Sequence, residues 1–192
     1  WATATALTGN VSKDAKTAGI VEAMVVASID HGVTPPSTQA GLIVASARAS
    51  YEVSLAAGIS AITDVHGGAG AKAASFFLSC RDLAKEQGLS LAAGVSQVMA
   101  KYVRSGARIE GLGHRVHTND PRRDALWKMA EKSKVAAECV TISKLAEGLF
   151  EKIRGLKLPI NVDGVIGAIV ADMGLPPKMA KALFVFGRVA GL

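Results

Sequence analysis

Apolar residues recur every three or four positions along almost the whole chain, and the alternation of apolar and polar residues that marks strands is rare. Alanine, a strong helix former, is abundant among them. This pattern predicts an all-α chain. Glycine, proline and aspartate interrupt it, and between these breaks we expect helices over about residues 12–29, 37–58, 71–87, 90–104, 121–134, 136–154, 162–173 and 177–190.

The predicted helices follow one another without an internal repeat, a low-complexity stretch or a Gly/Ser-rich linker. We expect a large helical domain formed by 1–100 together with 158–192, and a smaller lobe formed by 101–157. The chain starts at Trp1 without an initiator methionine and stops soon after Arg188. We therefore expect the large domain to lack residues at both ends.

A chain of 192 residues and 19.8 kDa can bury a core without covalent staples. Cys80 and Cys139 lie far apart in the sequence, so neither a disulfide framework nor a Cys-x-x-Cys metal site is indicated, and a reducing cytoplasm is the expected location. Mean hydropathy is +0.30, yet no apolar run reaches the roughly 18 residues of a membrane span. The apolar excess favours helices buried all round, or a surface packed against a second subunit.

The net charge of +6 does not by itself indicate a nucleic-acid partner. Lysines and arginines are scattered, mostly between Lys101 and Lys181, without a run of five or six. Aromatic residues make up only 5% of the chain, too few for a base-stacking platform. A small polyanionic ligand suits such a field, but an ordinary solvated surface is the simpler interpretation of charge alone.

The most informative stretch runs from Gly111 to Arg122 and reads Gly-Leu-Gly-His-Arg-Val-His-Thr-Asn-Asp-Pro-Arg. Its glycines allow main-chain N–H groups to approach a bulky ligand. His114 can exchange a proton near neutral pH, and Arg122 offers a planar fork that suits a carboxylate. Asp120 and Pro121 suit the N-cap and the first residue of the following helix.

Two further histidines stand beside glycine. His31 follows an apolar helix, where it suits either a cavity or, as the simpler interpretation, a C-cap favoured by the helix dipole. Ser37 then suits the N-cap of the next helix. His66 precedes Gly-Gly-Ala-Gly, a backbone that can turn N–H groups toward an oxyanion, and a neutral imidazole there can donate to a thioester oxygen. A tight loop that needs glycine for steric reasons explains the same residues equally well.

Two charged residues near the end of the chain have apolar neighbours. Asp163, in Asn-Val-Asp-Gly, is either an ordinary helix N-cap or a partly buried base able to remove a proton from carbon. Arg188 lies on the mostly apolar last helix, and it requires an anionic partner because burying an unpaired charge is costly. That partner is either a ligand or an aspartate in a structural salt bridge.

Metal and nucleotide sites find no support in the sequence. His31, His66 and His114 form no His-Glu-x-x-His pattern or other compact ligand pair, so we expect no metal. There is also no Walker loop, and no strand precedes a Gly-x-Gly-x-x-Gly pattern. ATP- and NAD-dependent activities are therefore not indicated.

Five motifs occur in a telling order: Asp-His with Ser-Thr at 30–38, His-Gly-Gly-Ala at 66–69, Gly-x-Gly-His-Arg-Val with Asp-Pro-Arg at 111–122, Asn-Val-Asp at 161–163, and Phe-x-x-Gly-Arg-x-x-Gly at 184–191. The series resembles the citrate synthase superfamily over about residues 20–192. The continuation Asn-Val-Asp-Gly-Val-Ile-Gly looks most like its citryl-CoA lyase branch, which includes the C-terminal module of ATP-citrate lyase. The resemblance implies an all-α dimer with a large domain and a small domain, here 101–157, that closes over CoA.

The resemblance also implies roles for individual residues. Substrate carboxylates would be bound by His31, Arg122 and Arg188. Catalysis would fall to His66, which polarises the thioester carbonyl, and to His114, near the substrate hydroxyl. The acid/base at the acetyl methyl carbon would be Asp163. The loop around CoA would be formed by Gly111, Leu112, Gly113 and Arg115.

On this resemblance the leading hypothesis is a citryl-CoA lyase, which cleaves citryl-CoA to acetyl-CoA and oxaloacetate. The alternatives are citrate or 2-methylcitrate synthase, and a catalytically silent protein that binds CoA ligands. We expect a homodimer that uses a CoA thioester as substrate and holds no permanent cofactor, with neither nucleic acid nor membrane as a partner. Thr118 departs from the family, since many citrate synthases have a basic residue there near a CoA phosphate.

Overall fold

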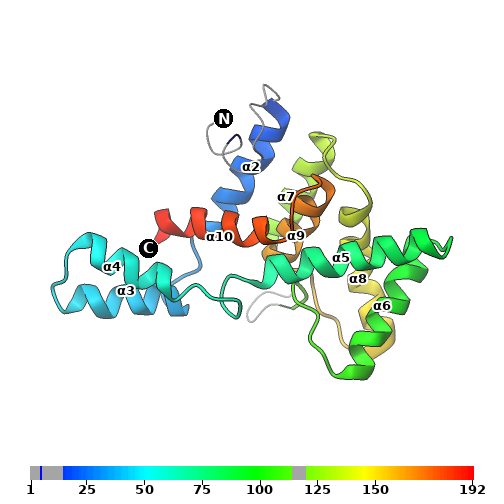
Figure 1. Ribbon diagram of the computed structural model, residues 1–192, viewed down its shortest axis with the longest axis horizontal. Coiled ribbons are helices and arrows are strands. Elements are labelled where there is room, and N and C mark those ends of the chain that lie inside the picture. The colour runs from blue at the N-terminus through cyan, green and yellow to red at the C-terminus, as the bar shows by residue number, and fades with distance from the viewer. Residues whose placement is uncertain (1–4, 6–14, 114–119) are drawn as a thin grey trace.

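The computed structural model describes residues 5, 15–113 and 120–192, and within these it is all-α, as predicted. No strand is present in the described part of the chain (Figure 1). The helices are α2 (Ala15–Ser28), α3 (Pro36–Ser46), α4 (Tyr51–Ser60), α5 (Ala69–Glu86), α6 (Leu91–Ser105), α7 (Pro121–Lys132), α8 (Glu138–Arg154), α9 (Val162–Asp172) and α10 (Lys178–Gly191).

Helix α9 forms the centre of the fold. It packs against α5, α7, α8 and α10, and every residue in it is buried except its two aspartates, Asp163 and Asp172. A helix that is apolar all round belongs in a protein interior, which agrees with the high mean hydropathy of the chain. Asp163 is thus an ionisable group at the start of the most buried helix.

Glycines let two pairs of these helices pack closely, α9 with α5 and α10 with α2. A Cβ on Gly167 of α9 would come within 2.5 Å of the Gly70 carbonyl oxygen in α5. A Cβ on Gly187 of α10 would lie equally close, at 2.5 Å, to the Val25 carbonyl oxygen in α2. The second contact brings α10 against the C-terminal half of α2, and it thereby sets the position of Arg188.

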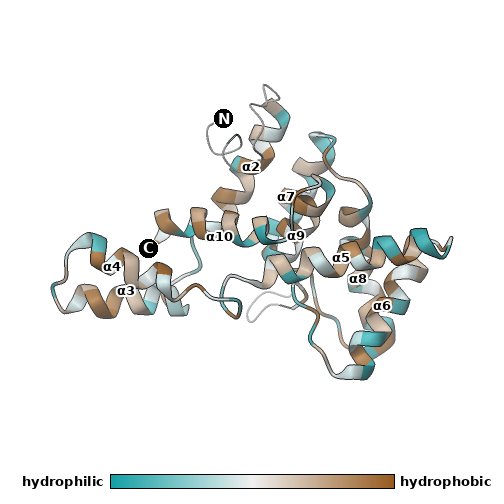
Figure 2. Ribbon diagram, viewed as in Figure 1, coloured by the Kyte–Doolittle hydropathy of each residue, from teal (hydrophilic) through white to brown (hydrophobic). Residues whose placement is uncertain are grey.

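The prediction of one helix over 37–58 is wrong. The structure has two antiparallel helices there, α3 and α4, joined by a turn in which Arg48 adopts a positive φ of 61° (Figure 1). The apolar spacing runs on through the turn, and its sequence Ala-Arg-Ala-Ser lacks the glycine or proline that usually marks a break. Several large apolar side chains of this hairpin are exposed, including Leu42, Ile43 and Tyr51. Hydrophobic stretches colour both of its helices in Figure 2.

The other described helices fall within a few residues of their predicted limits. The start of α7 is confirmed in detail, because Pro121 is its first residue and the Asp120 side chain accepts a hydrogen bond from the Arg122 N–H group (3.1 Å). Cys80 and Cys139 are both buried free thiols, and burial raises the pKa of each to about 12. No helix in the described ranges is long and apolar enough to cross a membrane.

Candidate active site

The glycine-rich loop lies directly against the start of α9. Leu112 and Ile160 form an antiparallel bridge, and the Gly113 N–H group donates to the Pro159 carbonyl (2.7 Å). Asn161 completes the contact, since its side-chain amide donates to the Gly113 carbonyl (2.8 Å). Gly113 has a φ of 93°, a conformation that side-chain-bearing residues rarely adopt. The requirement for glycine predicted from the sequence is therefore real at this position.

Asp163 is not the N-cap of its helix. That place belongs to Asn161, whose side-chain oxygen accepts from the Gly164 N–H group (3.0 Å), so the helix-cap interpretation of Asp163 is wrong. Burial raises the pKa of the Asp163 carboxyl to about 6, although the positive charges of Arg122 and Arg188 act in the opposite direction. A carboxyl of this kind exchanges a proton close to neutral pH.

Arg188 is among the largest fully buried side chains, with 1% of its surface exposed. Its Nε donates to the carbonyl oxygens of Ser28 (3.2 Å) and Ile29 (3.1 Å), at the C-terminal end of α2, and its guanidinium lies 4.6 Å from the centre of the Phe184 ring. Cations are favoured at that end of a helix. Burial lowers the pKa of Arg188, while the charge of Asp163 opposes that shift.

One nitrogen of the Arg188 guanidinium, Nη1, forms no hydrogen bond with the described residues. Nη1 is buried and finds no hydrogen-bond partner among the residues with described positions, and no carboxylate there forms an ion pair with Arg188. The alternative of a structural salt bridge is therefore wrong within those residues. A buried N–H donor without an acceptor is costly, and it marks a place where an anionic oxygen would bind.

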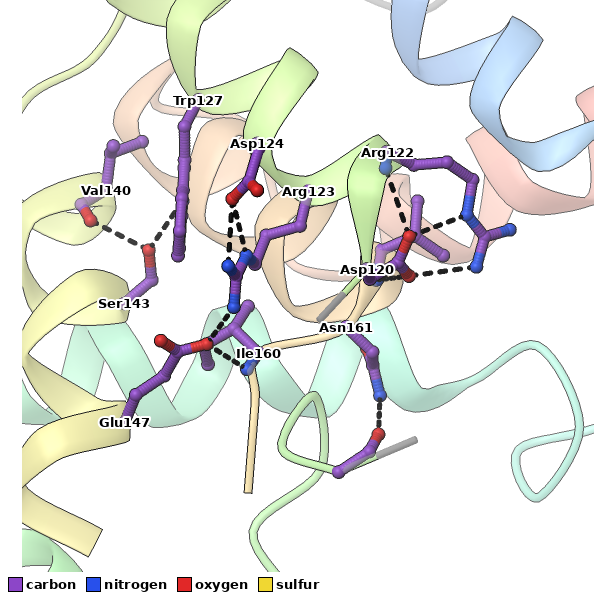
Figure 3. A network of polar contacts seen from close by, with 12 residues as sticks. Asp120, Arg122, Arg123, Asp124, Trp127, Val140, Ser143, Glu147, Ile160 and Asn161 are labelled. Carbon is purple, nitrogen blue, oxygen red and sulfur yellow. Dashed lines mark hydrogen bonds and ion pairs between the residues drawn. The ribbon is translucent and has the colours of Figure 1, made fainter. Parts of the chain in front are cut away.

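Arg122 carries its guanidinium against Asp120. Nε and Nη2 donate to the two carboxylate oxygens at 3.0 and 2.9 Å, and Nη1 has only a long contact of 3.5 Å with the Ala27 carbonyl (Figure 3). Burial by itself would raise the pKa of Asp120, but the hydrogen bonds and charge of Arg122 outweigh it and hold that pKa below its usual value. The Nη1–Nη2 edge of Arg122 keeps N–H groups that can bind a second carboxylate.

His66 lies half-buried between Ser37 and Phe184. Its Nε2 is 2.9 Å from the Ser37 hydroxyl oxygen, and its ring meets the Phe184 ring edge-on at 5.8 Å. The same Phe184 ring stacks on Arg188, so one aromatic side chain separates the imidazole from the guanidinium. Ser37 is fully buried and is not the N-cap of α3, a place taken by Pro35.

Of the remaining predicted site residues, His31 lies within the described part of the chain and His114 and Arg115 do not. His31 is exposed and follows the end of α2 by three residues, beside a turn in which Asp30 accepts from the Gly32 N–H group (2.9 Å). At the end of α2 the Arg188 guanidinium donates to the Ser28 carbonyl. His114 and Arg115 lie outside the described residues.

The structure therefore brings Asp163, Arg122, Arg188 and His66 toward one region and adds Asp120 and Ser37, which sequence analysis treated only as helix caps. No group of three His, Cys, Asp or Glu residues able to hold a metal ion occurs within the described ranges. The arrangement combines a carboxyl of raised pKa, two guanidinium groups and an imidazole in contact with Ser37, a set of groups that suits proton transfer on a carboxylate-bearing substrate.

Known proteins of similar sequence and structure identify the family of this chain. The family model described as "Citrate synthase, C-terminal domain" matches residues 2–192. The chain belongs to the citrate synthase family. The resemblance seen in the five motifs is thereby confirmed.

Individual family members give the same picture. The structure of citryl-CoA lyase from Hydrogenobacter thermophilus is 32% identical, covers 99% of this chain and 71% of that one, and superimposes with a TM-score of 0.86. Citrate synthase from Thermoplasma acidophilum, in a ternary complex with carboxymethyl coenzyme A and oxaloacetate, is 27% identical over 98% of this chain and 49% of its own, with a TM-score of 0.78.

Citrate synthase 1 of Mycobacterium tuberculosis is 29% identical over 170 residues, which are 81% of this chain and 37% of that protein. The chain thus spans a little over a third of the length of the curated relative.

Proposed function

We propose that this protein is a citryl-CoA lyase, which cleaves citryl-CoA to acetyl-CoA and oxaloacetate. The observation that carries the proposal is Asp163, whose carboxyl has a pKa raised to about 6 and is flanked by the charges of Arg122 and Arg188. The likeness to the Hydrogenobacter citryl-CoA lyase, over nearly the whole chain, supports the lyase over other members of the family.

Asp163 would act on the acetyl methyl carbon. In the cleavage direction the C3 hydroxyl of citryl-CoA loses its proton and the bond between C3 and the thioester-side methylene breaks, which leaves oxaloacetate and the enolate of acetyl-CoA. The protonated carboxyl then delivers its proton to the enolate carbon. With a pKa of about 6, about a tenth of the Asp163 population is protonated at pH 7. Condensation is the same path in reverse.

Two arginines would bind the carboxylates of the oxaloacetate part. Arg188 has a buried Nη1 without a partner among the described residues, and Arg122 has an edge that Asp120 does not occupy. His31 would add a third contact to that part of the substrate. These groups would keep the charged end of the substrate fixed while the bond to the methylene carbon breaks.

His66 would stabilise the enolate oxygen. If the Ser37 hydroxyl donates to Nε2, the neutral imidazole carries its proton on Nδ1, and that N–H group would donate to the thioester oxygen. His114 would take the hydroxyl proton. CoA would lie along the loop of Gly111, Leu112, Gly113 and Arg115, between a large domain (1–100 and 158–192) and a small one (101–157), in a homodimer.

The second candidate function is citrate synthase, and the names of the curated relatives favour it. A citrate synthase also hydrolyses the thioester, so the product mixture separates the two. The protein is incubated with citryl-CoA and the products are resolved by chromatography. We expect acetyl-CoA and oxaloacetate, whereas free citrate and CoA as the main products would exclude the lyase. Binding of acetyl-CoA and oxaloacetate without turnover would exclude both activities.

A further inference from the structure

Two consecutive arginines at the start of α7 send their guanidinium groups to different carboxylates (Figure 3). Arg123 pairs with Asp124 and with Glu147 of α8 and stacks on Trp127 at 4.7 Å. Arg122 pairs with Asp120 instead. The first turn of α7 therefore forms ion pairs on two sides. Arg122, the arginine proposed to bind substrate, pairs with Asp120 alone among the described carboxylates.

Asp120 is completely buried, and both of its oxygens are used. Oδ1 accepts from the N–H group (3.1 Å) and Nε (3.0 Å) of Arg122. Oδ2 accepts from Nη2 of Arg122 (2.9 Å) and from the N–H group of Val162 (3.2 Å). A helix cap needs only the first of these four hydrogen bonds. The other three bind a guanidinium and the backbone of a second helix.

Val162 is the first residue of α9 and directly precedes Asp163. One carboxylate thus binds the guanidinium of Arg122 and the backbone next to the acid/base carboxyl. We propose that Asp120 is a positioning residue, which holds Arg122 and the first turn of α9 in one fixed arrangement. The inference rests on the proposed function of Arg122 and Asp163, and it concerns a residue that would not itself touch the substrate.

The geometry of the pair fits this role. A guanidinium has five N–H groups in one plane, and Asp120 takes the Nε side of that plane. The side formed by Nη1 and Nη2 is thereby turned toward other partners in a fixed orientation. Without the Asp120 carboxylate, the Arg122 side chain would populate several rotamers, and each would orient the Nη1–Nη2 edge differently.

The charge of Asp120 also acts on Asp163. Four charged groups shift the pKa of the Asp163 carboxyl, namely Arg122 of α7 and Arg188 of α10, which lower it, and Asp120 and Glu110, which raise it. Removal of the Asp120 charge leaves the positive charge of Arg122 uncompensated. The loss of the negative charge of Asp120 and the uncompensated positive charge of Arg122 both favour the ionised form of Asp163.

The test compares Asp120→Asn with Asp82→Asn in the full chain. Asparagine caps a helix about as well as aspartate, so α7 should form, but an amide N–H₂ would meet the donors of Arg122 or Val162. Asp82 is a matched control because it also pairs with a neighbouring arginine, Arg81, on the exposed face of α5. Two quantities are measured: the pKa of Asp163 by carboxyl NMR, assigned with Asp163→Asn, and the pH dependence of citryl-CoA cleavage.

For Asp120→Asn we expect a lower pKa of Asp163. Because cleavage uses the protonated carboxyl, the alkaline limb of the rate should move to lower pH, with a kcat roughly tenfold lower and a higher KM. For Asp82→Asn we expect wild-type values. A purely structural Asp120 would lower the melting temperature and leave kcat and KM at wild-type values, and that result would overturn the proposal. The NMR measurement reports the coupling of Asp120 to Asp163 even if citryl-CoA is not turned over, so failure of the proposed function remains a separate result.

Val162→Pro gives a second test if Asp120→Asn does not fold. Proline is well tolerated at the first position of a helix, and the preceding Asn161 has the extended backbone (φ −95°, ψ 179°) that proline requires. The change removes the one N–H group that joins α9 to Asp120 and leaves the carboxylate intact. We expect a folded protein with a shifted pKa of Asp163 and a reduced kcat. Wild-type values of both would overturn the proposal.

Discussion

A Cβ placed on Gly164 would come within 2.5 Å of the carbonyl oxygen of Gly111. The reverse is also true, because a Cβ on Gly111 would lie 2.7 Å from the Gly164 Cα atom, and Gly111 has a φ of 86°. The glycine-rich loop therefore lies directly on the first turn of α9, one residue beyond Asp163. This contact sets how near the loop backbone comes to the Asp163 carboxyl.

Gly164→Ala should destabilise the protein, because its methyl group would push the loop away from α9. Overpacking of this kind typically costs about 1–3 kcal/mol. Gly148→Ala in α8 is the matched control, since a Cβ there meets nothing within 4 Å and alanine favours a helix by about 0.5–1 kcal/mol. Urea unfolding of both variants measures the difference. Equal stability of the two would contradict the close contact.

Ser37→Ala tests the orientation of His66. Without the hydroxyl, Nε2 of His66 loses its partner at 2.9 Å and the imidazole can rotate or change tautomer. We expect kcat to fall roughly tenfold, the scale measured for partners that orient metal-binding histidines, with little change in KM. Ser60→Ala serves as control, because the Ser60 hydroxyl donates only to the Ala56 carbonyl of its own helix. Unchanged kcat in Ser37→Ala would argue against a catalytic His66.

The sequence predicted most of the helices because their apolar spacing and their ends carry local signals. Asp120 and Pro121 illustrate this, since an N-cap residue followed by proline marks the first turn of a helix. The break between α3 and α4 was not predicted, because Arg48 supplies the positive φ that glycine usually provides. The only local signal for the break is Ser50, the N-cap of α4, and a single serine does not mark a turn by itself.

The site could be predicted only where one residue type implies one chemistry. Asp163 and Arg188 were singled out as charged residues in apolar surroundings. Asp163 lies in the first turn of the buried helix α9, and Arg188 lies on the buried face of α10. Ser37 and Asp120 were read as caps, because their second partners, His66 and Val162, are 29 and 42 positions away. Contacts over such separations follow from the packing of helices and carry no signal in the spacing of residues.

Arg188→Lys should impair binding of the oxaloacetate part without unfolding the protein. Lysine keeps the charge, but its single ammonium cannot bind the carbonyls at the end of α2 and also reach a ligand from the position of Nη1. We expect the Kd for oxaloacetate to rise roughly a hundredfold, about 2.7 kcal/mol. Isothermal titration measures it. Arg81→Lys, at a surface pair with Asp82, provides the control, and a Kd near the wild-type value in Arg188→Lys would remove Arg188 from the anion site.

The two aspartates of α9 give opposite predictions for the same substitution. Asp172 accepts hydrogen bonds from the N–H groups of Ala137 (2.7 Å), Cys139 (2.8 Å) and Val140 (2.9 Å), and it thereby caps α8. Asp172→Asn should lower the melting temperature and leave kcat close to wild type below it. Asp163→Asn should lower kcat by about two to four orders of magnitude, the usual scale for a positioned acid/base.

Stability distinguishes the two variants further. The pKa of Asp163 in the folded protein is raised to about 6 from an ordinary value of 3.8, so the protein loses stability as pH rises from about 4 to about 6 and stays at the lower level above that. The loss is at most about 3 kcal/mol and is reduced by the partial exposure of the side chain. Asp163→Asn lacks this titration and should be more stable than wild type at pH 7 and no more stable near pH 4. Thermal unfolding at the two pH values measures the change. An Asp163→Asn protein that is inactive but gains no stability at pH 7 would show that burial does not raise the pKa of this carboxyl.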